Sequence, residues 1–193
     1  MAWIAGERIV LRAWERDDVR ALWDAAQTLD DTGQRMRDWL EPPKSLAQLE
    51  QEFDGNVSEP DPTVVRLIIE AEGRAIGDID LFHIDQRSRN AVVGLGIWRE
   101  EDRGRGFGTD ALRTMLRWAF RHLNVHRIEL SVEPDNERAV RVYEKLGFVR
   151  EGMRREHHYD DGCFRDELIM GLLGREFEAT DRELTRAAVR TTP

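Results

Sequence analysis

The stretch DRGRGFGTDAL, Asp102–Leu112, places glycine at Gly104, Gly106 and Gly108 directly before an amphipathic pattern. Glycine at this density leaves the backbone amides uncovered. A helix that starts here points its first N–H groups and the positive end of its dipole in one direction. Helix starts of this kind bind anions, above all phosphate groups. The sequence therefore predicts a phosphate-binding loop that leads into a helix.

Two arginines of the loop, Arg103 and Arg105, can donate charge-assisted hydrogen bonds to phosphate oxygens. The spacing differs from the P-loop, because Thr109 follows Gly108 with no lysine between them. It also differs from the dinucleotide-binding fingerprint, because Thr109 stands where that motif has its third glycine. A turn whose glycines serve only backbone geometry is the alternative.

The hydrophobic pattern around the loop predicts an α/β fold with a twisted, mixed and mostly antiparallel sheet of about seven strands, flanked by helices. Ser45 is expected to cap one helix at its N-terminus and Gly147 to end another. Strands are expected over residues 7–14, 63–71, 76–85, 91–98, 126–132, 149–159 and 163–173. Helices are expected over 15–27, a short segment before Pro42, 45–53, 108–124 and 136–148, and after 173, with a flexible tail from about 182.

Length and charge limit the function. A chain of 193 residues suits one domain, here 1–193. A net charge of −9 argues against nucleic acid as a partner and favours a cation. No secretory signal or long apolar run is seen, so a cytoplasmic protein that binds no membrane is expected. The single Cys163 is expected to be an inert thiol, and no metal is expected. A monomer or homodimer is expected.

Two further glycines, Gly94 and Gly96, lie inside the expected strand AVVGLGIW, residues 91–98. Glycine weakens a strand interior and marks a bulge or the close approach of another chain. A ligand whose pyrophosphate lies on the loop could extend along this strand and bind its backbone. The pattern therefore favours a long, thin cofactor.

Two segments at this separation resemble the GNAT superfamily of N-acetyltransferases. The family's acetyl-CoA loop has Arg or Gln, two residues, Gly, one residue, then Gly or Ala, and Arg103, Gly106 and Gly108 match it. The segment EPDNERAVRVYEKLGF, Glu133–Phe148, resembles the family's segment with an Asn, a Tyr and Gly-Phe. The ending REHHYDDGCFRDELIMGLL resembles the branch that acetylates ribosomal-protein N-termini and polyamines such as spermidine.

This resemblance implies that acetyl-CoA binds where strands 91–98 and 126–132 splay apart, and that a primary amine attacks the thioester directly. Backbone N–H groups of 95–98 would polarise the carbonyl, as an oxyanion hole does. Tyr143 would be the general acid that protonates the departing thiolate. The residues implied to bind acetyl-CoA are Leu95, Gly96, Ile97, Trp98, Arg103, Gly104, Arg105, Gly106, Phe107, Gly108, Thr109 and Asn136.

The general base departs from the family pattern, because Val92 stands where many relatives of this branch carry Glu. A base must lie within hydrogen-bond reach of its proton, directly or through water. The sequence does not decide among five substitutes: Glu133, Asp80, His83, His157 and His158. We assign Glu133 to catalysis, and Trp39, Asp80 and His157 to the acceptor site.

The leading hypothesis is an acetyl-CoA-dependent N-acetyltransferase whose acceptor is a protein N-terminus, a polyamine, an amino acid or an aminoglycoside. The alternative is a non-catalytic protein that binds or senses acyl-CoA, which the missing Glu at Val92 makes conceivable. Tyr143 favours the enzyme.

Overall fold

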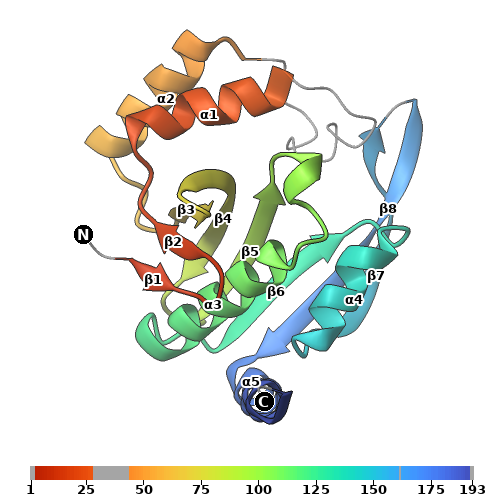
Figure 1. Cartoon of the computed structure of the whole chain (residues 1–193). Helices are drawn as coiled ribbons and strands as arrows, with labels where there is room; N and C mark the ends of the chain where they lie inside the picture. Colours follow the sequence, from red (N-terminus) through yellow and green to blue (C-terminus); the bar gives the residue numbers. More distant parts are fainter. Residues whose placement is uncertain (1–2, 28–43, 161, 192–193) are drawn as a thin grey trace. The chain divides into compact units, whose positions relative to one another are not determined.

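The computed structural model describes residues 3–27, 44–160 and 162–191. Its eight strands form a sheet in the order β1-β2-β3-β4-β5-β6-β8-β7 (Figure 1). The strands are β1 (Ile4–Ala5), β2 (Val10–Arg12), β3 (Val65–Ala71), β4 (Arg74–Asp85), β5 (Asn90–Ile97), β6 (Arg127–Val132), β7 (Val149–Asp160) and β8 (Cys163–Leu173). The helices are α1 (Arg16–Gln27), α2 (Leu46–Ser58), the 3-10 turn η2 (Glu100–Asp102), α3 (Phe107–His122), α4 (Glu137–Lys145) and α5 (Gly174–Thr191).

The predicted mixed, mostly antiparallel α/β architecture is confirmed. β5 and β6 pair in parallel, whereas β1–β2, β2–β3, β3–β4, β6–β8 and β7–β8 are antiparallel. The eighth strand is β1, which at two residues is too short to give a period-2 signal. The helix expected before Pro42 lies outside the described residues. α5 continues to Thr191, so the part expected to be a tail is helical, and its flexibility stays a prediction.

Contacts divide the chain into a first unit, residues 1–84 with 93–118, and a second unit, residues 85–92 with 119–193. The single domain expected from length therefore stays a prediction. None of the helices in the described part of the chain is long and apolar enough to cross a membrane.

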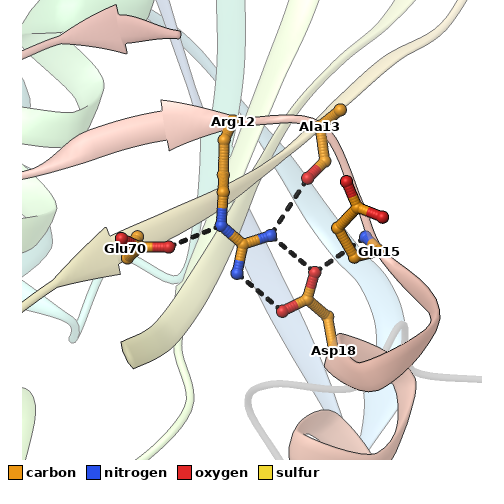
Figure 2. A network of polar contacts seen from close by, with 5 residues as sticks. All are labelled: Arg12, Ala13, Glu15, Asp18 and Glu70. Atoms are coloured by element: carbon orange, nitrogen blue, oxygen red, sulfur yellow. Dashed lines mark hydrogen bonds and ion pairs between the residues drawn. The ribbon is translucent and has the colours of Figure 1, made fainter. Parts of the chain in front are cut away.

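In the first unit, α1 and α2 lie side by side (Figure 1), and α1 is joined to the sheet by Arg12 of β2. Figure 2 shows how its guanidinium bridges two carboxylates: Nη1 and Nη2 donate to Asp18 at 2.7 and 2.8 Å, and Nε donates to Glu70 of β3 at 2.6 Å. Asp18 also accepts the N–H of Glu15, one of the amides left without a partner where α1 begins. These hydrogen bonds raise the pKa of Arg12 further, so the bridge stays charged.

The helix after the glycine loop is fastened to the β1–β2 connection by Asp110. Its carboxylate accepts the backbone N–H groups of Glu7, Arg8 and Ile9 at 3.1, 2.7 and 3.2 Å. A Cβ at Gly6 would lie 2.7 Å from the same carboxylate, so only glycine fits there without a shift. Asp110 thus fixes the first turn of α3 to a segment that lies about 100 residues earlier in the sequence.

The second unit is built on the long hairpin of β7 and β8, with β6 on the other side of β8. The start of β5 pairs with β6 here, through Asn90↔Arg127, Ala91↔Ile128 and Val92↔Glu129. The rest of β5 belongs to the first unit, so the predicted splay between the two strands stays a prediction. The buried apolar side chains of this unit include Ile128, Leu130, Val140, Leu146, Phe148, Met170, Leu172 and Phe177.

Candidate active site

The glycine loop in the first unit forms the helix start that the sequence predicts. Gly104 and Gly106 have φ of +76° and +88°, in the left-handed region that favours glycine. α3 begins at the next residue, and its first intrahelical bond runs from the Asp110 N–H to the Gly106 carbonyl at 3.1 Å. The amides from Gly106 to Thr109 therefore have no acceptor within the helix, and Gly106 offers no side chain to cap them. This set of donors fits a pyrophosphate.

A buried carboxylate holds the glycine loop in place. Asp102 is 1% exposed and accepts two hydrogen bonds from the guanidinium of Arg74, at 2.8 and 2.5 Å. Arg105 lies 3.5 Å from the same carboxylate and also pairs with Glu72. This ion pair links the glycine loop to Arg74 of β4. The hydrogen bonds to Asp102 also raise the pKa of Arg74.

The two arginines expected at the phosphates bind protein groups in the structure. Arg103 donates from Nε to the carbonyl of Ile97 at 3.1 Å and from Nη2 to that of Trp98 at 3.4 Å, so it closes the loop onto the end of β5. Arg105 is held by acidic partners. Contact of either guanidinium with a phosphate stays a prediction, whereas their part in shaping the loop is observed.

Arg8 is a cationic neighbour of the loop that the sequence did not reveal. Its guanidinium donates to the carbonyl of Arg105 and lies 4.9 Å from the ring of Phe107, which Arg105 also approaches at 4.7 Å. Arg8 Nη1 would lie only 3.3 Å from a Cβ at Gly106. Nearly 100 residues separate Arg8 from the loop, so no local pattern could have found it.

Neighbouring atoms crowd β5 at two of the glycines on and beside it, Gly94 and Gly77. A Cβ at Gly77 of β4 would collide with the carbonyl oxygen of Gly96, so these two backbones approach closely. The ring of Phe82 lies 3.3 Å from where a Cβ of Gly94 would be. The crowding thus falls on Gly94 and on Gly77, and a ligand that extends along β5 stays a prediction. Trp98 donates its N–H to the Ile76 carbonyl at 2.9 Å, so this amide is already engaged.

In the second unit, Asn136 and Tyr143 lie at opposite ends of α4. Asn136 is the N-cap, and its side chain accepts the Ala139 N–H at 3.2 Å. At the other end, Gly147 has φ of +98°, and the N–H groups of Gly147 and Phe148 donate to Glu144 and Tyr143 at 3.0 and 3.1 Å. This Schellman motif fixes the last turn of the helix, as expected for a glycine at that place.

Tyr143 is half-buried, and its ring packs edge-on against Phe148 with centroids 5.9 Å apart. Burial raises the pKa of Tyr143 to about 12. Since desolvation disfavours the phenolate, the hydroxyl keeps its proton over the whole physiological range. The group therefore has the protonation state that a proton donor needs.

The candidate bases differ in what they contact. Glu133, directly after β6, has its Oε1 3.3 Å from Nε2 of the buried His158. His157 lies 3.4 Å from Glu167, which Arg154 also contacts. In the first unit, the predicted acceptor residue Asp80 lies 3.7 Å from Arg66. Trp39 lies outside the described residues, and no group of three His, Cys, Asp or Glu side chains among the described residues could hold a metal.

Comparison with known proteins decides the family. Residues 8–149 match the family model described as the acetyltransferase (GNAT) domain. The chain belongs to the GNAT acetyltransferase family. It is 31% identical to the spermidine N(1)-acetyltransferase of Vibrio cholerae, over 88% of this chain and 95% of that protein. It is 30% identical to the putative ribosomal N-acetyltransferase YdaF of Bacillus subtilis, over 89% and 94% of the two chains.

A solved structure agrees with this result. The V. cholerae spermidine N-acetyltransferase in complex with CoA and spermine superposes with a TM-score of 0.78, at 28% identity, over 89% of this GNAT chain and 98% of that one. The predicted resemblance is confirmed. This GNAT protein is an acetyl-CoA-dependent amine N-acetyltransferase, so the enzyme is supported over the acyl-CoA sensor.

We predict that Gly106→Val weakens acetyl-CoA binding by about 10- to 100-fold, the equivalent of one or two charge-assisted hydrogen bonds. A β-branched side chain at φ of +88° strains the loop and covers the amides of α3. Titration calorimetry measures the affinity. Gly162→Val is the matched control, because Gly162 has φ of +80° in the hairpin turn and no described atom lies within 4 Å of its Cβ position. Normal affinity in a folded Gly106→Val protein would mean that the glycines serve only the turn.

Proposed function

We propose that this GNAT protein acetylates an aliphatic polyamine, and that the amine attacks the thioester directly with both substrates bound. The match to spermidine acetyltransferases along nearly the whole chain is the main support. The net charge of −9 favours approach of a polycation. The relative solved with CoA and spermine provides a precedent for this pair of ligands.

The loop is proposed to hold acetyl-CoA by its pyrophosphate. The amides from Gly106 to Thr109 donate to it, and the guanidiniums of Arg8 and Arg105 beside Phe107 add positive charge. Acetyl-CoA supplies the activated acyl group. Asn136 is proposed to contact the pantetheine arm in addition to capping α4.

The end of β5 is proposed to polarise the acetyl carbonyl. The candidates are the N–H groups of Leu95, Gly96 and Ile97, because the Trp98 amide already donates to Ile76. Donors fixed in a strand need no reorganisation during the reaction, which is why such groups contribute strongly to rate. No covalent intermediate with the enzyme is required.

Tyr143 is proposed to donate the proton that the departing sulfur takes. Its pKa of about 12 keeps the hydroxyl protonated, and the packing on Phe148 restricts the ring. General acids placed in this way contribute about 10²-fold or more to turnover.

An amine panel tests the substrate class. We expect spermidine and spermine to give a kcat/KM about tenfold or more above an alkyl monoamine, an aminoglycoside, a free amino acid or a peptide with a free N-terminus, which corresponds to about 1.4 kcal/mol. Release of free CoA thiol is measured, with product mass as a check. If a peptide ranks first, a protein N-terminus is favoured instead, in line with the name of the putative ribosomal N-acetyltransferase YdaF. Binding of acetyl-CoA without thiol release from any amine would refute the proposal.

We predict that Tyr143→Phe lowers turnover by about 10²-fold while acetyl-CoA affinity and melting temperature stay unchanged, because only the hydroxyl is lost. Wild-type turnover should show no loss from tyrosine ionisation up to about pH 10, since the pKa of Tyr143 is raised to about 12. Single-turnover rates on the best amine measure the effect. Undiminished chemistry in the folded variant would leave Tyr143 as a packing residue.

A further inference from the structure

Trp98 directly follows β5, the strand whose N–H groups are proposed to polarise the acetyl carbonyl. Trp98 is 4% exposed and packs in one cluster with Ala25 of α1 and Ile68 of β3. The ring of Trp14 lies beside it, with the ring centroids 6.3 Å apart and the planes tilted by 54°. An indole enclosed in this way has little freedom to move, so the backbone that carries it is fixed as well.

Hydrogen bonds hold Trp98 through both its backbone and its side chain. The backbone N–H donates to the carbonyl of Ile76 on β4 at 2.9 Å. The indole N–H donates to the carboxylate of Asp78, two residues further along the same strand. The Trp98 carbonyl accepts from Arg103 of the glycine loop at 3.4 Å. The end of β5 is therefore tied to β4 by a backbone bond and by a side-chain bond.

The two neighbouring indoles differ in what their N–H groups bind. An indole nitrogen is only a donor, so it needs an acceptor when it is buried. The Trp98 N–H has this acceptor in Asp78, whereas the buried Nε1 of Trp14 has no hydrogen-bond partner in the part of the chain that the structure describes. Of the two rings, only that of Trp98 is therefore tied to β4 by its indole N–H.

The direction of the Trp98 N–H also sets that of the residue before it. Successive N–H groups of a strand point to opposite edges, so the N–H of Ile97 points away from β4. Arg103 donates to the Ile97 carbonyl at 3.1 Å and thereby holds the peptide between Ile97 and Trp98. The Ile97 N–H is one of the candidate donors to the acetyl carbonyl. A misplacement of about 1 Å in such a group can cost about 10²-fold in rate.

We propose that Trp98 is a positioning residue of acetyl transfer: its indole N–H, bound to Asp78, holds the end of β5 so that the Ile97 N–H is aimed at the acetyl carbonyl. The proposal rests on the proposed function of the β5 amides. Trp98 acts through the backbone and does not touch the reacting atoms. Its hydrogen bond therefore supports turnover, whereas the affinity for acetyl-CoA depends on the glycine loop.

The test compares Trp98→Phe with Trp14→Phe. Trp98→Phe removes the indole N–H and keeps an aromatic ring in the cluster. We expect its single-turnover rate on the best amine to fall about 10- to 100-fold, while the Kd for acetyl-CoA stays within about twofold of wild type. Trp14→Phe is the matched control, because it removes from the neighbouring ring an N–H that has no partner among the described residues. Its rate should stay within about twofold of wild type.

Substitution of the acceptor tests the same hydrogen bond from its other end. Asp78→Leu removes the acceptor, whereas Asp78→Asn keeps an oxygen that the indole can bind. We expect Asp78→Asn to be faster than Asp78→Leu, and Trp98→Phe combined with Asp78→Leu to be no slower than Asp78→Leu alone. Losses that add in the double variant, or an Asp78→Asn protein as slow as Asp78→Leu, would overturn the proposal. If Trp98→Phe fails to fold, the two Asp78 variants carry the comparison.

The carbonyl of bound acetyl-CoA gives a second readout that a purely structural role would not move. Hydrogen bonds lower the C=O stretching frequency, so isotope-edited infrared spectra of carbonyl-labelled acetyl-CoA, without amine, report its polarisation. We expect Trp98→Phe to shift this band towards that of free acetyl-CoA and Trp14→Phe to leave it as in wild type. Either a wild-type rate or an unshifted band in folded Trp98→Phe would overturn the proposal. A wild type that releases no CoA thiol with any amine would instead refute the proposed function, and the infrared comparison would still stand.

Discussion

The site depends on one constraint: the N-terminus of α3 has to be fixed in place while its amides stay uncovered. A side-chain cap would satisfy those amides and close the site, so the fixing contacts come from elsewhere. Asp110 turns its carboxylate to the β1–β2 connection, where it accepts three N–H groups. Asp102 and Arg74 brace the loop from β4, and Arg103 binds the last carbonyls of β5. Only Gly106, at φ of +88°, lies where a cap would lie.

The opposite arrangement holds at α4, whose two ends are both satisfied. Asn136 caps the start, and the Schellman motif at Gly147 closes the end. A helix of nine residues has little stability of its own, so these caps and the buried Val140 fix it in place. What α4 provides is side-chain position: Tyr143 on its last turn packs against Phe148, and Glu133 just before its cap faces His158. The start of α3 thus offers backbone amides to a ligand, whereas α4 positions side chains.

The parts that sequence predicted are those encoded locally. Helical periodicity, the N-cap at Ser45 and the glycine after α4 depend on neighbours within a few residues, and each is found. The glycine loop could be predicted from the sequence for the same reason. Three features depend on residues about 20 to 100 positions apart: the contact of Arg8 with the loop, the anchoring by Asp110, and the close approach of the Gly96 carbonyl that requires glycine at Gly77. The pairing of His158 rather than His157 with Glu133 depends on a bulge in β7, in which three residues, 155–157, lie opposite one residue of β8. No turn residue in the sequence indicates this bulge.

Hydrogen–deuterium exchange tests most directly whether the α3 amides bind the pyrophosphate of CoA. The exchange of the amides from Gly104 to Thr109 is followed in the free protein, with saturating CoA, and with saturating pantetheine, which lacks the pyrophosphate and the nucleotide. We expect CoA to slow exchange at these amides and pantetheine to leave it unchanged, because backbone N–H groups at a helix start donate to phosphate oxygens. Calorimetrically proven binding of CoA with no slowing at this loop would contradict the account.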